Sequence, residues 1–215
     1  MPARMSAHAP TCRHALAAEP AHPPATVIRP PAPGEEAALA ALMRAMEAHY
    51  GVSVGDGVAE KAAATLCRGQ GPGLCLVAPS DKGSDEGSGE GSGEGSDEGS
   101  GEGLLGAVFF TELFPGAGLA PVFYMKDLFV LPAARGQGHG AALVRAVAAL
   151  ARQRGIGRVE WTTGTDNLAA RRFYAGLGAS QPAKVCLQLD EAGIARLAVG
   201  TPVAGTLDPA AETRD

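Results

Sequence analysis

The stretch DLFVLPAARGQGHGAALVRAVAAL, residues 127–150, decides the fold. It predicts a β-strand that stops at Pro132, a glycine-rich turn over residues 135–140, and a helix over residues 138–154 with apolar side chains every third or fourth position. A glycine-rich turn that enters a helix presents backbone N–H groups at the positive end of the helix dipole. The stretch therefore predicts a site for a phosphate or pyrophosphate, with a plain glycine-rich helix start as the alternative.

Two other phosphate-binding folds, the dinucleotide-binding fold and the P-loop fold, also contain a glycine-rich turn of this kind. Gly136, Gly138 and Ala141 match the dinucleotide pattern G-x-G-x-x-A. Glu160 lies roughly twenty residues further on, where such folds place a ribose-binding acid. In those folds the turn follows its strand at once, whereas residues 132–135 intervene here. A P-loop would need Gly-Lys-Ser/Thr after the glycines. The context argues against both folds.

The composition excludes several classes of protein. The chain has 215 residues, of which 46% are hydrophobic and 19% charged, and it contains no apolar run near the ~20 residues that span a bilayer. The formal net charge is −5, but residues 81–103 contribute −7 and leave +2 for the rest. A nearly neutral fold without a basic stripe disfavours nucleic acid as a partner. We expect no membrane segment and no nucleic-acid ligand.

The spacing of the cysteines indicates whether the protein binds a metal and in which cellular compartment it lies. Cys12, Cys67, Cys75 and Cys186 lie far apart, and no C-x-x-C pair occurs. This spacing excludes zinc-ribbon and thioredoxin-type sites. We expect reduced thiols, no metal and a cytoplasmic location, with an organellar presequence at the N-terminus as the alternative.

The chain divides into four kinds of segment. Residues 1–25 are rich in Ala, Pro and His and predict a disordered leader, and residues 199–215 predict a flexible tail. One catalytic-sized domain is expected over residues 26–198. Within it, residues 80–103 form an acidic Gly/Ser-rich insertion, of which residues 83–102 are five tetrapeptides of the type GSGE. Such a stretch predicts a solvated, flexible coil.

The rest of the chain predicts alternating strands and helices. The predicted strands cover residues 26–29, 74–78, 104–113, 122–131, 158–163 and 185–189, and the predicted helices cover residues 34–49, 58–68, 138–154 and 166–177. The acidic insertion falls between two consecutive strands, which places it at the tip of a β-hairpin.

The turn resembles the pyrophosphate loop of the GNAT superfamily of acetyl-CoA-dependent N-acetyltransferases, which has the form Arg/Gln-x-x-Gly-x-Gly/Ala. The matching residues are Arg135, Gly138 and Gly140. A later segment is similar to a second motif of that family through Asn167, Ala170, Phe173, Tyr174, Leu177, Gly178 and Ala179. The resemblance covers residues 25–198 apart from the insertion. The segments FYMKDLFV, RGQGHG and NLAARRFYAGLGA are most similar to the diamine (spermidine/spermine) N-acetyltransferase branch.

The resemblance implies an α/β fold of the GNAT acyl-CoA N-acyltransferase type. Its mixed, mostly antiparallel sheet would be flanked by helices and splayed between residues 122–131 and 158–163. It also implies acetyl-CoA as co-substrate. The implied cofactor-binding residues are Leu128, Phe129, Val130, Arg135, Gly136, Gln137, Gly138, His139, Gly140, Ala141, Asn167 and Tyr174. The strand backbone and Asn167 would contact the pantetheine, and the turn would wrap the pyrophosphate.

The resemblance implies two catalytic residues, Tyr174 and Asp127. Tyr174 would protonate the departing thiolate, because a phenol with an ordinary pKa near 10 is protonated at neutral pH; an aromatic packed beside Phe173 is the alternative. Asp127 would orient the amine or relay its proton through water, with a surface ion pair as the alternative. Tyr50, Asp127 and Trp161 are the expected contacts of the acceptor, and core packing is the alternative for Trp161.

The expected function is transfer of the acetyl group of acetyl-CoA to a primary amine of a small molecule, either diamine-like or amino-acid-like. Lys126 and Gly51 stand where the diamine branch has carboxylates. The alternatives are a protein or peptide N-acetyltransferase and a CoA-binding sensor module without turnover. A homodimer is compatible with this interpretation.

Overall fold

The computed structural model describes residues 27–80, 103–183 and 185–199. The chain forms two compact units, residues 1–161 and 162–215, which are described separately. The strands of the first unit are β1 (Gly73–Pro79), β2 (Leu104–Leu113), β3 (Val122–Val130) and β4 (Val159–Glu160). Its helices are α1 (Glu36–His49), α2 (Val58–Cys67) and α3 (His139–Gln153), with short 3-10 turns η1 (Ala117–Leu119) and η2 (Pro132–Ala134). The second unit contains α4 (Leu168–Gly176) and α5 (Glu191–Ala198).

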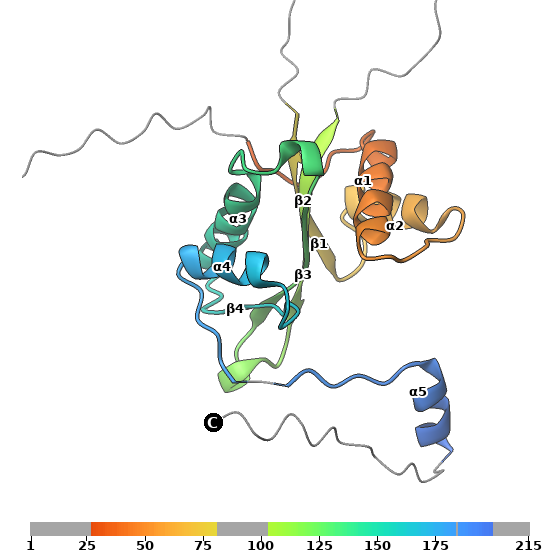
Figure 1. Cartoon of the computed structure of the whole chain (residues 1–215), viewed down its shortest axis with the longest axis vertical. Helices are drawn as coiled ribbons and strands as arrows, with labels where there is room; N and C mark the ends of the chain where they lie inside the picture. The colour runs from red at the N-terminus through yellow and green to blue at the C-terminus, as the bar shows by residue number, and fades with distance from the viewer. Residues whose placement is uncertain (1–26, 81–102, 184, 200–215) are drawn as a thin grey trace, which may run out of the picture. The chain divides into compact units, whose positions relative to one another are not determined.

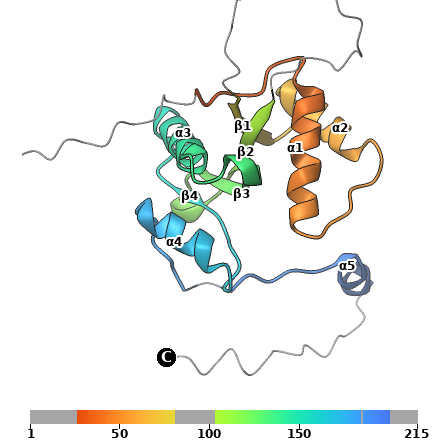
Figure 2. The same ribbon diagram turned by 45° about the horizontal axis from the view of Figure 1, so that its top comes forward.

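The first unit is built on one four-stranded sheet with the order β1-β2-β3-β4. The pairs β1–β2 and β2–β3 are antiparallel, and β3–β4 is parallel. Helices α1 and α2 cover one face of this sheet and α3 covers the other (Figures 1 and 2). The predicted mixed, mostly antiparallel α/β architecture is confirmed.

Periodic apolar residues bury one stripe of each helix against the sheet. In α1 the buried side chains are Leu39, Leu42 and Met46, which recur every three or four residues. They join residues of α2, β1, β2 and β3 in one core cluster. In α3 the buried side chains recur every four residues, and Leu143 and Val147 are almost fully buried. Each such aliphatic side chain contributes roughly 1.5–3 kcal/mol of stability.

The parallel pairing of β3 and β4 is short. It joins Phe123 to Val159 and Tyr124 to Glu160 and then stops. Within the described chain, the edge of β3 from Met125 to Val130 that faces away from β2 therefore has no strand partner. The predicted strand over residues 158–163 is corrected, because it is a strand at residues 159–160 only and pairs with β3 over those two residues.

Two further expectations, one on a strand and one on a helix start, are corrected. The predicted strand over residues 26–29 is a single bridge between Arg29 and Val77, because Pro30 cannot donate to a ladder. The helix predicted to open at Asp166 has Asn167 as its N-cap, which accepts a hydrogen bond from the Ala170 N–H at 3.1 Å.

The predicted strand over residues 185–189 is absent from the structure. Val185 and Leu187 are each 84% exposed. Apolar alternation makes a strand only where an edge is available for pairing. Sequence reasoning also missed α5, although Asp190 caps it by accepting from the Gly193 N–H at 2.6 Å. The signal for α5 was an N-cap Asp followed by an amphipathic run.

The acidic insertion connects paired strands. β1 and β2 form an antiparallel hairpin, and the Ser80 N–H donates to the Gly103 carbonyl at 2.8 Å. The predicted leader, the body of the insertion and the predicted tail after residue 199 lie outside the described residues and remain predictions. Among residues 27–80, 103–183 and 185–199, no helix has the length and apolar character that a bilayer crossing requires.

Candidate cofactor and acceptor site

The glycine-rich turn joins the end of β3 to the start of α3. After η2, Arg135 is extended, and Gly136 and Gly138 take left-handed conformations with φ of +77° and +87°. A Cβ at either glycine would meet no atom within 4 Å. Glycine is therefore favoured at both positions by the left-handed backbone and not by lack of space for a side chain. A residue with a Cβ in this conformation costs about 1–2 kcal/mol.

The first turn of α3 presents backbone donors. The Ala142 N–H makes a helical bond to the Gly138 carbonyl at 3.0 Å, so the N–H groups of residues 139–141 precede the helical ladder. The preceding residues 135–138 are exposed. His139 is only 8% exposed and belongs to the buried stripe of α3. What His139 can offer an anion is therefore its backbone N–H.

Side chains hold the turn in shape. The Arg135 Nε donates to the Val130 carbonyl at 3.1 Å, and the guanidinium carbon lies 5.8 Å from the centre of the Phe129 ring. The Gln137 Nε2 donates to the Ala133 carbonyl at 3.1 Å. These bonds tie the turn to the end of β3 and to η2.

The open edge of β3 is the second component of the site. The Leu131 N–H donates to the Leu105 carbonyl at 2.9 Å, and the register continues through Ala107 opposite Phe129. Hydrogen-bonded and non-hydrogen-bonded pairs alternate along an antiparallel ladder. The backbone groups of Leu128 and Val130 therefore face away from β2, toward the edge that β4 leaves open.

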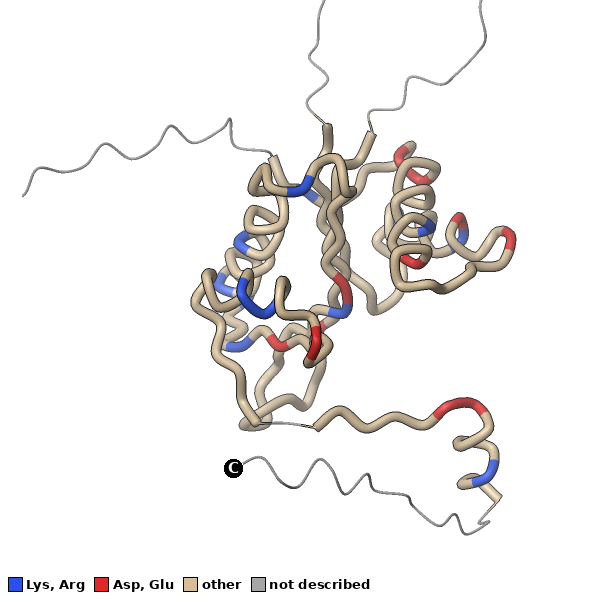
Figure 3. The backbone as a smooth tube through the Cα atoms, viewed as in Figure 1, with Lys and Arg blue, Asp and Glu red and all other residues tan. Residues whose placement is uncertain are grey.

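The segment that contains the turn and α3 is basic. Residues 128–159 contain five arginines and neither Asp nor Glu, and Figure 3 shows basic but no acidic positions along α3. Arg154 lies 3.7 Å from Glu112 and Arg158 lies 3.0 Å from Glu160, which neutralises part of this charge. The remaining positive charge favours an anionic ligand. The run of five arginines without acids is a signal for an anionic ligand that can be read from the sequence.

The end of α1 meets β3 on the face that α1 and α2 cover. The His49 ring lies 5.9 Å from the Phe129 ring and 5.5 Å from the Tyr50 ring. Tyr50 is 56% exposed. Asp127 precedes Phe129 by two residues and so shares its face of β3. The structure thus brings Tyr50 to the same side of the sheet as Asp127.

A β-bulge lies beside Asp127. Phe109 pairs with Asp127 and Phe110 pairs with Met125, which leaves Lys126 as the extra residue. The Lys126 Nζ lies 3.3 Å from a carboxylate oxygen of Asp127. Trp161 is half-buried and follows β4 directly.

Two predicted site residues belong to the second unit. Asn167 uses its side-chain oxygen to cap α4. Tyr174 is half-buried, and its ring packs edge-on to the Phe173 ring at 5.0 Å. The structure therefore groups Tyr50, Asp127, residues 128–130 and the turn within the first unit, and it holds Asn167 and Tyr174 on one helix of the second.

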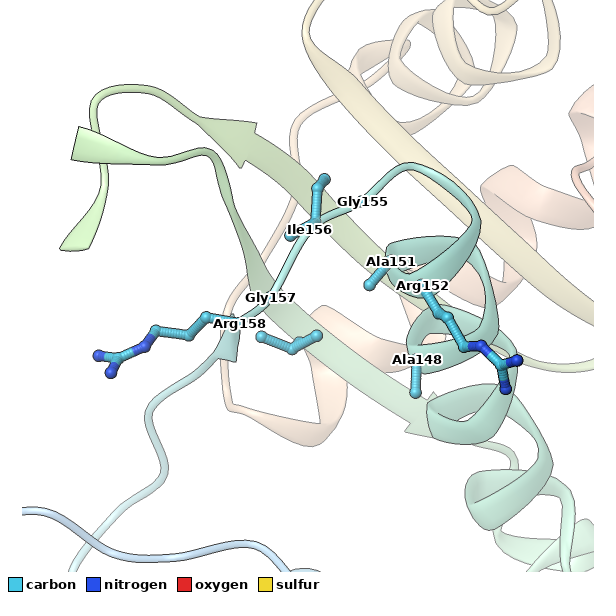
Figure 4. Close-up of a pocket in the computed structure, with 8 residues that line it drawn as sticks. Ala148, Ala151, Arg152, Gly155, Ile156, Gly157 and Arg158 are labelled. Carbon is cyan, nitrogen blue, oxygen red and sulfur yellow. The ribbon is translucent and has the colours of Figure 1, made fainter. Parts of the chain in front are cut away.

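One described pocket lies apart from all of these residues. It has a volume of about 420 Å³ and is lined by Ala148, Ala151, Arg152, Gly155, Ile156, Gly157, Arg158 and Val159. Small residues of α3 leave this hollow against the segment that leads into β4. The side chains of Arg152 and Arg158 extend away from each other (Figure 4), so they do not converge on an anion. The pocket contains none of the predicted site residues.

A comparison with known protein families gives a match over the segment that contains both the glycine-rich turn and the later motif of residues 167–179. The sequence model of the acetyltransferase (GNAT) family matches residues 96–179. The matched segment contains β3, the glycine-rich turn, α3 and α4.

A sequence relative and two solved structures are similar to the chain. The L-ornithine N5-acetyltransferase NATA1 of Arabidopsis thaliana is 38% identical over 74 residues, which are 34% of this chain and 32% of that protein. This chain thus matches about a third of the length of that relative. An integron cassette protein from the mobile metagenome of V. cholerae has a TM-score of 0.59 at 24% identity, over 80% of this chain and 96% of its own.

AAC(6')-Iy, solved with the bisubstrate analog CoA-S-monomethyl-acetylneamine, has a TM-score of 0.58 at 15% identity, over 77% of this chain and 97% of its own. At such identities the structural likeness establishes the fold alone. With the family match, it establishes the GNAT fold for this chain.

Proposed function

We propose that this protein is an acetyl-CoA-dependent N-acetyltransferase that acts on a primary amine of a small molecule. The observation that carries this proposal is the arrangement of the glycine-rich turn, which leads into the N-terminus of α3 directly beside the open edge of β3. A helix N-terminus binds phosphate through backbone N–H groups. An open strand edge can pair with the amides of an extended ligand.

The residues present fit acetyl-CoA. Its pyrophosphate would accept hydrogen bonds from the N–H groups of residues 139–141, and the left-handed Gly136 and Gly138 expose the turn to it. Leu128 and Val130 would bind the pantetheine amides through the backbone groups that face the open edge. The backbone of Phe129 pairs with Ala107 and its ring is buried in the core, which corrects the expected contact of Phe129 with the pantetheine. Phe129 would instead support the site by packing between His49 and Arg135.

The reaction joins the amine nitrogen to the acetyl carbon while the carbon–sulfur bond breaks. Acetyl-CoA supplies an activated acetyl group as a thioester. An ammonium acceptor must lose one proton before attack and a second as the amide forms, and the thiolate gains one, so one proton is released overall. Asp127 would orient the acceptor amine and pass its proton to water.

Tyr174 is proposed as the general acid for the thiolate on the strength of its match to the GNAT motif. Its phenol is the type of group that can give a proton at neutral pH. Asn167 is proposed as a pantetheine contact on the same basis, through the side-chain nitrogen that its capping bond does not use.

The acceptor is proposed to be a diamine or an amino acid. The sequence segments that resemble the diamine branch support the first, and the relative that acts on L-ornithine supports the second. The free thiols of Cys67, Cys75 and Cys186 favour a cytoplasmic protein with reduced cysteines.

The test is thiol release from acetyl-CoA, measured against a panel of diamines, amino acids, aminoglycosides and peptides. Turnover with a small amine supports the proposal, and turnover with peptides alone would indicate a protein N-acetyltransferase. CoA binding without turnover on any member would instead indicate a CoA-binding module. Isothermal titration calorimetry with CoA provides the binding measurement.

A further inference from the structure

The bulge in β3 brings two opposite charges to one side of the sheet. In a regular strand, successive side chains point to opposite faces. Lys126 and Asp127 are successive, yet the Lys126 Nζ lies 3.3 and 3.5 Å from the two carboxylate oxygens of Asp127. The unpaired Lys126 between the Phe109 and Phe110 pairings interrupts the alternation and lets the two side chains meet.

The two charges differ in exposure. The Asp127 side chain is 20% exposed and the Lys126 side chain is 72% exposed. The carboxylate is therefore held in place on the face where α1 ends in His49 and Tyr50, while the ammonium reaches into solvent. A surface ion pair contributes little to stability, so each partner is available to exchange the other for a ligand charge.

We infer that the acceptor is an amino acid and that Lys126 determines this specificity. Asp127 accepts hydrogen bonds from the acceptor ammonium, and Lys126 donates to the acceptor carboxylate. A zwitterion replaces the Lys126–Asp127 pair with two pairs of opposite charges. A diamine of the same length satisfies Asp127 but has no carboxylate to pair with Lys126 or to offset its second ammonium. This inference rests on the proposed acetyl transfer and names its substrate class.

The experiment compares acceptors that differ only by a carboxylate. Ornithine and putrescine form one such pair, and lysine and cadaverine form another. We expect kcat/KM for the amino acid to exceed that for the matching diamine by roughly tenfold or more, the effect of about one charge contact. Lys126→Glu should reverse the preference, and Lys126→Met should remove most of it. The change in kcat/KM should lie mainly in KM, because Lys126 would bind the acceptor carboxylate and would not contact the reacting amine or thioester.

Lys61→Glu is the matched control. Lys61 is exposed on α2, and its replacement alters the net charge by the same amount. It should leave the ratio of the two acceptors unchanged. The affinity for CoA and the melting temperature should be the same in all variants, which separates acceptor recognition from folding.

The outcomes separate this inference from the proposed function. Turnover with equal preference for both members of each pair, or a preference that Lys126→Glu leaves intact, overturns the inference while acetyl transfer stands. Failure of every acceptor to release thiol overturns the proposed function and this inference with it. A reversed preference in Lys126→Glu, absent in Lys61→Glu, supports both.

Discussion

At the scale of single residues, Gly138 joins local conformation to ligand binding. Its φ of +87° makes it the left-handed N-cap of α3, and the space where its Cβ would stand is open. A substitution here therefore acts through backbone strain and through the charge that it places at the helix N-terminus. A pair of side chains of equal shape can separate the two effects, because Asn and Asp both tolerate left-handed backbone.

Gly138→Asp should bind CoA more weakly than Gly138→Asn. The two variants share their strain, and only Asp places a negative charge beside the pyrophosphate. At a separation near 4 Å and an effective dielectric constant of 20 or more, the difference is about 2–4 kcal/mol, or roughly 30- to 1000-fold in Kd. Calorimetric titration with CoA measures it. Equal affinities for CoA in two folded variants would show that the pyrophosphate does not bind at this turn.

Tyr174→Phe should lower kcat by about 10² to 10⁴ and leave the affinity for CoA unchanged. The substitution keeps the ring that packs on Phe173 and removes only the hydroxyl group. The lower part of the range is expected, since CoA thiolate is a fairly good leaving group. Steady-state kinetics with the best acceptor checks this. Activity within threefold of the wild type would make Tyr174 a packing residue.

At the scale of elements, one strand provides both halves of the site. β3 presents backbone groups at its open edge and, through the bulge, the Lys126–Asp127 pair on one face. A separate set of contacts holds the segment before α1 against the sheet. Arg29 bridges to Val77 of β1 and donates to Glu35, the N-cap residue of α1, at 2.7 and 2.8 Å. The Ala32 N–H also donates to Glu35, at 2.6 Å.

Glu35→Gln should destabilise the protein by about 1–2 kcal/mol at neutral pH, because it removes the charge from a partly buried pair. The hydrogen bond from Arg29 is the main cause that lowers the pKa of Glu35 below its ordinary value of 4.5. A lowered pKa stabilises the fold above pH 4.5, and this stabilisation is lost as the pH falls through the folded-state value.

Urea denaturation at pH 7 and at pH 3 measures the effect of Glu35→Gln. The difference between the variant and the wild type should shrink at pH 3. Glu36→Gln is the control, since Glu36 accepts only an exposed bond from the Gly34 N–H. A loss for Glu35→Gln that stays the same at both pH values would mean that ionisation of Glu35 is not the cause.

At the scale of the whole molecule, charge is distributed unevenly along the sequence. The formal net charge of −5 arises because residues 83–102 carry seven acids and no bases. The hairpin strands on either side of this segment pair through Ala78 and Gly106. The pairing of β1 with β2 therefore uses only residues that lie outside the acidic segment.

Replacing residues 83–102 with Asn-Gly should leave thiol release nearly unchanged and the melting temperature equal or slightly higher. Shortening the connection reduces the closure entropy by roughly 1.5 kcal/mol for a flexible loop, and Asn-Gly suits a tight hairpin turn. The net charge should change from −5 to +2, which anion-exchange elution will show. A large loss of activity would assign the acidic segment a part in acceptor binding.

The sequence by itself determined the features that depend on local geometry. The left-handed glycines, the start of α3 beside them and the stripes of α1 and α3 follow from backbone sterics and the 3.6-residue period. These constraints act within a few residues, so a reader of the sequence has all the information. The hairpin around the acidic insertion was predictable for the same reason, since two β-rich runs flank it.

The tertiary structure alone decided the features that depend on a partner strand. The extra residue Lys126 exists only as a mismatch between β2 and β3, and no pattern within β3 reveals it. β4 is two residues long because pairing with β3 ends there, and residues 185–189 stay unpaired despite an alternating pattern. Register and pairing are relations between segments distant in sequence. The ion pair of Lys126 with Asp127, and the acceptor chemistry inferred from it, therefore became visible only in three dimensions.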